Sequence, residues 1–596
     1  MTSPRSDSQT APHELEARPT GERFSDAWIV AAASAAATGA YLELSVSALA
    51  VLVVVSVATQ WPRVAVVIVV ALVVGELANR SLDGLDAELP ATVVGPVELV
   101  GDPEWIGSSV RVDVRADGRR YESWSRGAIA GFVAELASGE SMVIGGQVSP
   151  FSTDWKSRRA RHVAGRLQIA EASQSAPASG PVGLANRIRR LVVVGGASLS
   201  DRDRVLLTGF TVGDDRQQLP EVTDDFRAAG LTHLTAVSGQ NVAFVLLLIR
   251  PLLRRLGPVG RLALVVAILV QFGLITRWEP SVMRAIAMAI AAAATQLGAR
   301  QRSGLPLLAG VVALLLIIDP MLVHSIGFRM SVFASIGIAT LSGPLARRVR
   351  GPAWITDPLA LTLAAQLGVA PVVLATFGSM PLVSVPANLL AGPVSGPLMA
   401  WGLTAGPVAG LVGGGAAAAL HLPTRVMTGY VASIAQLASA VDGPDIDVPK
   451  ALVLVALGAW IWLLRQRMGR TGLAMVVVAV ALWPVPATFD VTGAELHQSS
   501  GSTILVVDRP SPTRLLSELR TSRIDSVDLL IVESRSAATL RTVDAVRKRV
   551  NVRETISAGE DDRRATVLVG PFRVVVTPSG NRLDVEVERR EVSFVG

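Results

Sequence analysis

The chain has 596 residues, of which 50% are hydrophobic and only 17% are charged, and its mean hydropathy is +0.46. A soluble chain would carry about a quarter of charged residues, so these values exclude an ordinary soluble protein and indicate a polytopic membrane protein. Cysteine is absent, which excludes a disulfide framework, a thiolate metal site and a thiol nucleophile. The net charge of +6 is typical of basic cytoplasmic loops, and a nucleic-acid surface is the alternative.

Residues 1–24 are polar and lack the apolar core and cleavage site of a signal peptide, so we predict a cytoplasmic tail. Residues 25–79 contain three apolar runs, which predict the N-terminal transmembrane helices. These runs lie at 27–40, 44–58 and 64–77.

Residues 81–172 differ in character, because short runs of alternating polarity are separated by Gly and Asp. This period of two predicts a soluble β domain, either a small sheet or a barrel. Two basic groups in it are interleaved with aromatic residues, which suits a single nucleic-acid strand because guanidinium groups bind phosphates and rings stack on bases. A solvated strand face or a contact with anionic lipid is the alternative. The first group is Trp155, Lys156, Arg158, Arg159, Arg161 and His162, and the second is Arg111, Arg115, Arg119, Arg120, Tyr121, Trp124 and Arg126.

Residues 173–200 begin as a linker rich in Ser, Ala, Pro and Gly and continue as an amphipathic helix from residue 182. Such a helix either lies in the membrane interface or packs on the β domain.

Residues 201–486 form the main membrane block, and its Arg clusters predict the topology because Lys and Arg favour cytoplasmic loops. The clusters lie at 254–261, 300–302, 347–350 and 465–470. This alternation places the N-terminus in the cytoplasm and both the β domain and the C-terminal tail outside, with about eleven to thirteen spans. Residues 384–403 and 415–437 are interrupted by Gly, Pro or charged side chains and are candidates for broken or re-entrant helices.

Residues 230–241, GLTHLTAVSGQN, are polar but open an apolar run at 242–249. Polar groups in hydrocarbon are costly unless they find partners or line a wet cavity, so we predict that this segment faces other helices or a water-filled path. The candidates for lining that path are His233, Ser238, Asn241, Arg284, Gln366 and Asn388. Gly230 and Gly239 are predicted to allow close backbone approach.

Each lining candidate has a structural alternative, because polar residues in helix bundles also hydrogen-bond between helices at about 0.6 kcal/mol per bond. For Arg284 the alternatives are an ion pair with Glu279, five residues earlier in the chain, and a side chain that extends to the outer membrane interface.

Residues 487–596 alternate between strand and helix patterns and predict an α/β domain. The expected strands are 503–507, 527–532, 567–569, 572–576 and 583–587, and the expected helices are 512–519 and 538–548.

The stretch FRAAGLTHLTAVSG at 226–239 resembles the ComEC family of competence proteins, which form the inner-membrane channel for single-stranded DNA in natural transformation. Three further blocks follow in the family's order, so the resemblance covers roughly residues 206–403. They contain Pro280-Ser281 with Arg284-Ala285, then Asp319-Pro320 with Gly327-Phe328, then Ala365-Gln366 with Pro386-Ala387-Asn388-Leu389. The resemblance implies an OB-like fold for residues 81–172 and a metallo-β-lactamase-like fold for residues 487–596.

The chain departs from that family at two places. Asn241 stands where the family usually has histidine, and the family's His-x-His-x-Asp-His run, expected after Ile531, is replaced by VESRSAA. No histidine follows His497. Because a two-metal hydrolase needs several imidazoles and carboxylates around its ions, we expect a degenerate tail without metal or nuclease activity of that type.

The sequence thus predicts a polytopic α-helical membrane protein with an extracytoplasmic OB-like β domain and a C-terminal α/β domain, acting as a channel for single-stranded DNA. No catalytic residue, metal ligand or cofactor is assigned. The expected partners are single-stranded DNA, membrane lipid and a cytoplasmic DNA-translocating ATPase, since the chain has no GxxxxGK[ST] motif; a homodimer is left open. The alternatives are a transporter of another polyanion or solute and an extracytoplasmic nuclease that uses the OB-like domain.

Overall fold

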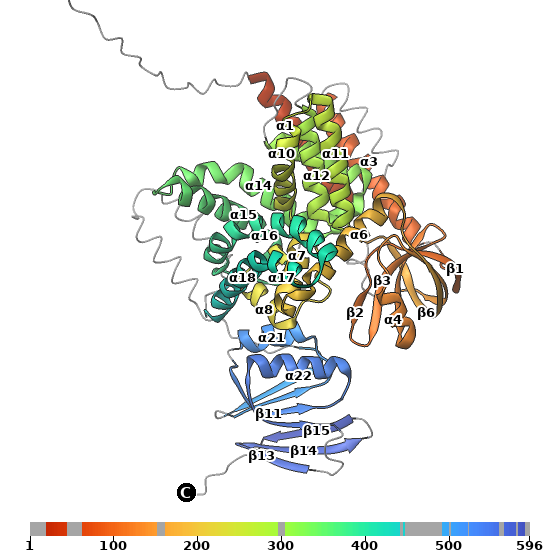
Figure 1. Ribbon diagram of the computed structural model, residues 1–596, viewed down its shortest axis with the longest axis vertical. Helices are drawn as coiled ribbons and strands as arrows, with labels where there is room; N and C mark the ends of the chain where they lie inside the picture. The colour runs from red at the N-terminus through yellow and green to blue at the C-terminus, as the bar shows by residue number, and fades with distance from the viewer. Residues whose placement is uncertain are drawn as a thin grey trace, which may run out of the picture. The chain divides into compact units, whose positions relative to one another are not determined.

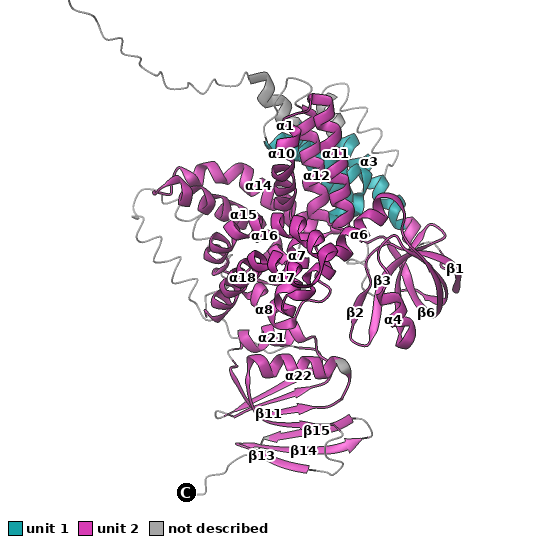
Figure 2. Ribbon diagram, in the orientation of Figure 1, with its two compact units in different colours: residues 1–82, 300–323 teal, residues 83–299, 324–596 magenta. Residues whose placement is uncertain are grey.

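The computed structural model describes most of the chain in two compact units. The described residues are 20–43, 62–86, 88–151, 161–235, 237–295, 304–441, 445–447, 491–499, 502–522, 524–558, 565–579 and 582–589. Residues 1–82 and 300–323 form the first unit, and residues 83–299 and 324–596 form the second (Figure 2). The predicted cytoplasmic tail lies largely outside the described residues, and the helix predicted at 44–58 lies entirely outside them.

The first unit is built from apolar helices. They are α1 (Thr20–Leu42), α3 (Pro62–Asp86) and α13 (Gly304–Ile318), followed by a 3-10 turn at Pro320–His324. A Cβ atom at Gly39 would lie 2.0 Å from the carbonyl oxygen of Ala71, so α1 and α3 approach closely because a small residue stands at their contact.

The β domain in the second unit is a closed barrel of five strands (Figure 1). Its elements are β1 (Thr92–Leu99), β2 (Glu104–Ile106), β3 (Ser109–Ala116), β4 (Arg119–Arg126), α4 (Gly127–Ala134), β5 (Ser141–Ser149) and β6 (Val163–Ala176). Pairing runs β1-β5-β6-β4-β3 and closes through β1–β3, and β4 and β6 are parallel whereas the other pairs are antiparallel. Side chains that alternate along the strands fill the interior, among them Leu99, Tyr121 and Leu167.

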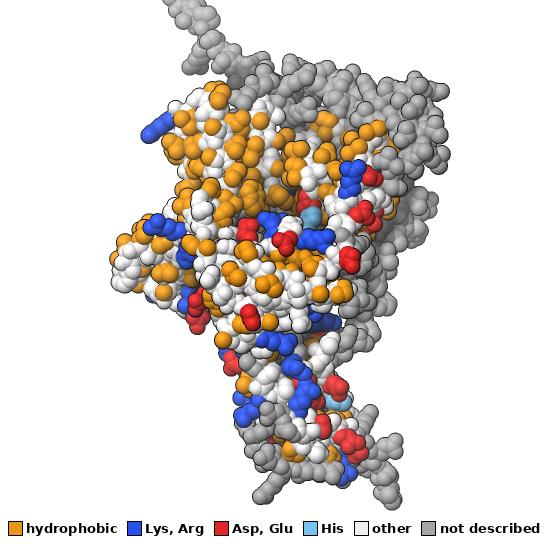
Figure 3. Space-filling model, turned by 90° about the vertical axis from the view of Figure 1, so that its right-hand side faces the viewer, with side chains coloured by type: hydrophobic (Ala, Val, Ile, Leu, Met, Phe, Trp, Pro, Cys, Tyr) orange, Lys and Arg blue, Asp and Glu red, His pale blue; other side chains and the backbone are white. Residues whose placement is uncertain are grey.

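The helical block of the second unit carries the longest apolar helices. Its elements are α6 (Gly180–Gly195), α7 (Asp201–Val212), α8 (Pro220–Ala228), α9 (Thr232–Thr235), α10 (Gly239–Leu253), α11 (Pro258–Ile275), α12 (Pro280–Thr295), α14 (Ile326–Ala346), α15 (Ala353–Phe377), α16 (Ser384–Val412), α17 (Gly414–Leu420) and α18 (Leu422–Ala440), with a 3-10 turn at Gly196–Ser198 and the short strands β7 (Ser379–Pro381) and β8 (Asp445–Asp447). Three described helices, α11, α14 and α15, are long and apolar enough to cross a membrane. On the face drawn in Figure 3, hydrophobic side chains cover most of the upper part, and most charged side chains lie in the middle and lower parts.

The helix α16 is continuous from Ser384 to Val412 although Pro393, Pro397 and Pro407 lie inside it. A break near Pro393 was therefore the wrong prediction for this segment. Neighbouring helices pack closely along α16 at glycines: a Cβ atom at Gly402 would lie 2.1 Å from Thr211 Cγ2. Such packing tolerates prolines that would bend an isolated helix. The second interrupted segment does divide, at His421 between α17 and α18.

The amphipathic helix α6 packs against α16 on one side and touches the barrel on the other. A Cβ atom at Gly410 of α16 would lie 2.2 Å from the carbonyl oxygen of Leu191. On the polar side, Asn186 Nδ2 donates to the carbonyl oxygen of Ser138, at 3.0 Å. The helix was predicted either to lie in the membrane interface or to pack on the β domain, and the structure shows it in contact with α16 and with the β domain.

The C-terminal tail contains two sheets that pack face to face. Its elements are β9 (Ala494–Ser499), β10 (Ser502–Val507), α21 (Pro512–Thr521), β11 (Ser526–Val532), α22 (Ala537–Arg549), β12 (Asn551–Ser557), β13 (Ala565–Val569), β14 (Phe572–Ser579) and β15 (Arg582–Arg589). The order of the first sheet is β12-β11-β10-β9, with β10, β11 and β12 parallel, and that of the second is β13-β14-β15. Ile504 and Leu529 bury against Phe572 and Val574 between the sheets. The helices α21 and α22 cover the outer face of the first sheet (Figure 1).

The tail contacts the helical block through ion pairs with α8. Arg549 Nη1 lies 2.9 Å from Asp225 Oδ1, and Lys548 Nζ lies 2.9 Å from Glu221 Oε1. Arg520 Nε lies 3.7 Å from Asp224, whose side chain is only 1% exposed. The tail thus presents basic helix ends to an acidic helix.

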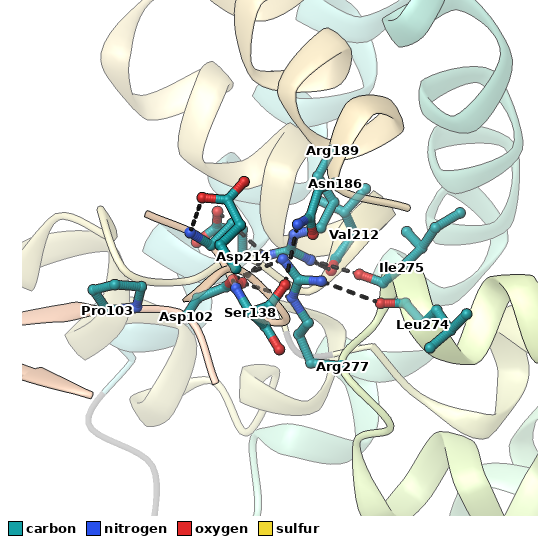
Figure 4. Close-up of polar contacts among 12 residues, drawn as sticks. Asp102, Pro103, Ser138, Asn186, Arg189, Val212, Asp214, Leu274, Ile275 and Arg277 are labelled. Carbon is teal, nitrogen blue, oxygen red and sulfur yellow. Dashed lines mark hydrogen bonds and ion pairs between the residues drawn. The ribbon is translucent and has the colours of Figure 1, made fainter. Parts of the chain in front are cut away.

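The barrel is held on the helical block by a buried network around Asp102, in the loop between β1 and β2 (Figure 4). Arg189 Nη2 lies 2.9 Å from Asp102 Oδ2, and Arg277 donates to both carboxylate oxygens of Asp102 at 2.9 and 2.7 Å. Arg189 also pairs with Asp214 at 3.4 Å and donates to the carbonyl oxygen of Ile275 at 2.7 Å. Burial on its own would raise the pKa of Asp102, but the Arg189 and Arg277 guanidiniums lower it well below its usual range.

We expect Asp102→Asn to lower the free energy of unfolding of the full chain by about 3–5 kcal/mol, because it leaves two buried guanidiniums without their shared carboxylate. Thermal unfolding in detergent measures the loss. Since the folded pKa is lowered, the contribution of Asp102 is present above its unfolded pKa of about 3.9 and is lost as the pH falls through the folded value. The difference between variant and wild type should therefore be constant from about pH 5 to pH 8.

The control for this test is Glu98→Gln, which removes the exposed pair between Glu98 and Arg115, 3.4 Å apart. A pair of this kind contributes less than about 1 kcal/mol. Equal losses in the two variants would show that the Asp102 network does not hold the barrel.

Candidate functional site

In the polar segment 230–241, called the loop 230–241 below, the described residues up to Ser238 connect α8 to α10 through the single turn α9, and residues 239–241 are the first turn of α10. Leu231, Leu234 and Val237 are buried among the surrounding helices and anchor it. Its backbone finds local partners: the amide of Leu231 donates to the carbonyl oxygen of Phe226 at 2.7 Å. Irregular backbone inside a helical membrane domain is tolerated only where protein satisfies it or a cavity is lined, and here neighbouring helices hold both ends of the loop.

The Gly230 end of the loop meets a polar cluster from α15 and α16. Gly230 has a φ of +66°, and a Cβ atom on it would lie 2.3 Å from Ser384 Cβ. Asn388 Nδ2 donates to the carbonyl oxygens of Ser384 at 2.7 Å and of Gly230 at 3.4 Å. Ser384 Oγ donates to Gln366 Oε1 at 3.0 Å. Three of the residues singled out in the sequence, Gly230, Gln366 and Asn388, are therefore brought together here.

The Gly239 end of the loop faces Arg284 on α12. Arg284 is 9% exposed, and its Nε donates to Ser331 Oγ on α14 at 2.8 Å. One expected alternative, an ion pair of Arg284 with Glu279, is not formed. Ser281 Oγ donates to the carbonyl oxygen of Val237 at 2.9 Å, which ties the loop to the same helix.

Asn241, Ser238 and His233 complete the predicted set. Asn241 is 9% exposed and donates from Nδ2 to the carbonyl oxygen of Phe210 on α7, at 3.2 Å. Ser238 is half-buried at the N-cap of α10. His233 is exposed on α9, and its ring hydrogen-bonds with the backbone of Gly230 at the start of the segment. The structure thus divides the predicted residues between the two ends of one loop.

Ser384 was missed by the sequence analysis, although it connects Gly230 with Gln366. Its signal was its spacing, because Ser384 and Asn388 stand four residues apart and lie on the same side of one helix.

Three described arginines in the basic groups of the barrel pair with acidic side chains, and Arg119, Arg120 and Arg126 donate to carbonyl or hydroxyl oxygens. Arg161 pairs with Asp113, at 3.1 Å, and with Glu122. Arg111 lies 2.6 Å from Glu104, and its neighbour on the strand, Arg115, is similarly paired. Burial would raise the pKa of Glu122, but its hydrogen bond from Arg161 lowers it. Trp155, Arg158 and Arg159 lie outside the described residues, in the connection between β5 and β6.

In the tail, Arg582 lies at the carboxyl ends of the parallel strands β10 and β11. Asp508 follows β10 and Ser534 follows β11, and Ser534 Oγ donates to Asp508 Oδ1 at 2.8 Å. Arg582 Nη2 donates to Asp508 Oδ2 at 3.0 Å. Across the described residues, no group of three His, Cys, Asp or Glu side chains is placed to hold a metal ion. The guanidiniums of Arg582 and Arg509 both lie beside Asp508.

Comparison with known proteins connects the loop to a family. Residues 210–468 match the family model described as competence protein. The chain is similar to ComE operon protein 3 of Bacillus subtilis (strain 168), with 29% identity over 191 residues. That match covers 32% of this chain and 24% of the relative, so it spans about a quarter of the relative's length. No solved structure matches.

We predict that Gly230→Ala lowers the unfolding temperature of the full chain, since its Cβ would meet Ser384 and its left-handed conformation would be strained by about 1–2 kcal/mol. Gly378→Ala is the matched control, because Gly378 has a φ of +79° but nothing within 4 Å of an added Cβ. The unfolding temperature of Gly378→Ala measures the effect of backbone strain alone, and any further decrease in Gly230→Ala measures the effect of the contact with Ser384. Equal shifts would show that the close approach to Ser384 is not required.

A metal titration tests the tail. We expect the full chain to bind no stoichiometric zinc and to show no zinc-dependent cleavage of DNA, because Arg582 stands beside Asp508 and imidazoles are lacking there. Isothermal titration and a nuclease assay with and without chelator measure both properties. Stoichiometric zinc that is lost in Asp508→Ala would contradict the prediction.

Proposed function

Because this chain belongs to the competence-protein family through residues 210–468, we propose that it is a membrane channel that takes up single-stranded DNA during natural transformation. The observation that carries the proposal is the loop 230–241 within the matched domain. It inserts polar, irregular backbone among apolar helices and is held at both ends by buried polar side chains. A strand of DNA needs such a polar path between helices.

The barrel supports the proposal through its topology. A closed five-stranded barrel with one parallel pair and a helix between its third and fourth strands is the arrangement of OB folds, which bind oligonucleotides through a strand face and two loops. The connection between β5 and β6 corresponds to one of those loops and carries Arg158 and Arg159. On this proposal, DNA first contacts the barrel at that connection.

Two contacts support a common, extracytoplasmic side for the soluble domains. Arg541 of the tail donates to the carbonyl oxygen of Gly107 in the barrel, at 2.7 Å. The strands β7 and β8, which lie in loops predicted to be outside, pair with each other. The N-terminus is then cytoplasmic. Translocation would be driven by a cytoplasmic DNA-translocating ATPase, and membrane lipid would surround α11, α14 and α15.

A transporter of another polyanion or solute is the second candidate. The observation that favours it is the pairing of the described barrel arginines with carboxylates, such as Arg161 with Asp113 and Glu122. These pairs leave fewer free cations for phosphates than the sequence suggests.

DNA uptake in cells tests the proposal directly. Expression of the chain in a transformable bacterium that lacks its own uptake channel should restore the accumulation of labelled DNA inside the cell. The double variant Arg158→Ala, Arg159→Ala should reduce it. The purified full-length variant should bind oligothymidylate with a salt slope that is smaller by about 1.4, since each lost phosphate contact removes about 0.7.

Arg111→Ala is the control for this experiment, because Arg111 is already paired with Glu104. Arg161 is kept, since its loss would leave Asp113 and Glu122 unpaired. Cells that express the chain at normal levels and take up no DNA would refute the channel and favour the solute transporter.

A further inference from the structure

Arg284 is a buried guanidinium without a carboxylate. Its Nε donates to Ser331 Oγ at 2.8 Å, and its Nη1 lies 3.2 Å from Met288 Sδ. Within the described part of the chain it forms no ion pair, and its Nη2 makes no hydrogen bond. Buried charges are ordinarily paired, as Arg189 is with Asp102. Arg284 therefore leaves a positive charge that the described residues do not balance.

A second positive group lies beside it, at the N-terminus of α10. This helix spans Gly239–Leu253, and its N-cap residue Ser238 makes no side-chain capping bond. The amide of Asn241 reaches the carbonyl oxygen of Ser238, whereas the amides of Gly239 and Gln240 have no acceptor among the described residues. Free amides at a helix start carry roughly half a positive charge and attract anions.

The guanidinium of Arg284 and the N-terminus of α10 lie close together. A Cβ atom on Gly239 would lie 3.0 Å from Arg284 Nη2 and 3.2 Å from Ala285 Cβ. Glycine at this position thus lets the guanidinium reach the first turn of the helix. Two positive groups at such close range are unfavourable together unless an anion joins them.

We propose that Arg284 and the first turn of α10 form a binding site for a phosphodiester group of the DNA backbone, an inference that rests on the proposed function. A phosphodiester carries one negative charge and two free oxygens, so one oxygen can accept from the guanidinium and the other from the helix amides. Ser238 is half-buried and is the N-cap residue of α10. Arg284 binds the backbone and not a base, so the site accepts any sequence.

Binding of oligothymidylate to the purified full-length chain tests the site. Arg284→Met removes the charge but keeps an apolar side chain of similar length. We expect it to weaken binding by at least about tenfold and to reduce the salt slope by about 0.7. Arg284→Lys keeps the charge without the planar fork and should fall in between. An oligothymidylate with uncharged methylphosphonate linkages should bind wild type and Arg284→Met equally.

Two controls separate a binding site from a structural contact. Arg204→Gln removes an arginine that pairs with Asp201 at 2.7 Å. Arg204 is not among the residues proposed to contact DNA, so this variant should bind oligothymidylate as wild type does. The unfolding temperature of Arg284→Met without DNA should be no lower than that of wild type, because an uncompensated buried charge is replaced by an apolar side chain. A sharp fall in that temperature together with unchanged DNA binding would show that Arg284 serves only to join α12 and α14.

The remaining outcomes distinguish the site from the function. If Arg284→Met internalises and binds DNA like wild type, the phosphate site is wrong while the channel stands. If binding depends on Arg284 but cells expressing the chain accumulate no DNA, the site stands and the channel is wrong. If inorganic phosphate at millimolar concentration raises the unfolding temperature of wild type but not of Arg284→Met, while oligothymidylate binds both equally, the site takes free phosphate and the assignment to the DNA backbone is overturned.

Discussion

The carboxylate of Asp102 holds two guanidiniums from different helices, and the placement of the barrel on the helical block depends on this pairing. Arg189 comes from α6 and Arg277 from the end of α11, where it adopts a left-handed conformation with a φ of +57°. Such a conformation is costly for a residue with a side chain and persists where its surroundings demand it. Here the two hydrogen bonds to Asp102 stabilise the left-handed conformation of Arg277. The loop between β1 and β2 is thereby fixed, and with it the orientation of the strand face that the barrel presents.

Buried charges are ordinarily paired, and Arg284 departs from this rule whereas Arg189 follows it. Arg189 is 6% exposed and has two carboxylates and two backbone carbonyl groups around it, whereas Arg284 is 9% exposed and has a hydroxyl and a thioether. The two side chains are buried to nearly the same degree, so burial does not explain why one has carboxylate partners and the other has none among the described residues. A structural arginine is neutralised where it stands, whereas one that awaits an anionic ligand is left with its charge.

Local patterns in the sequence predicted local structure well. The strand and helix patterns of the tail reappear as β10, α21, β11, α22, β13, β14 and β15, because alternation and helical periodicity are read over a few residues. β4 was missed, since Arg119, Arg120 and Arg126 made it look like a basic surface although Tyr121 and Ser123 point inward. The contacts that build the site were out of reach: Asn388 and Gly230 are 158 residues apart, and Arg277 and Asp102 are 175 apart. The continuity of α16 through its prolines likewise depends on helices that only the fold brings against it.

The tail supplies cations to buried carboxylates of α8. Asp224 and Asp225 on α8 are 1% and 5% exposed, and burial raises the pKa of Asp224 although Arg520 and Arg549 counter this effect. Without the tail, these carboxylates and Glu221 would face no partner from α21 and α22. Since α8 leads directly into the loop 230–241, the ion pairs that hold α8 also fix the start of that loop at Gly230. The basic helix ends of the tail, with Arg520, Lys548 and Arg549, are therefore the part of the tail on which the position of α8 depends.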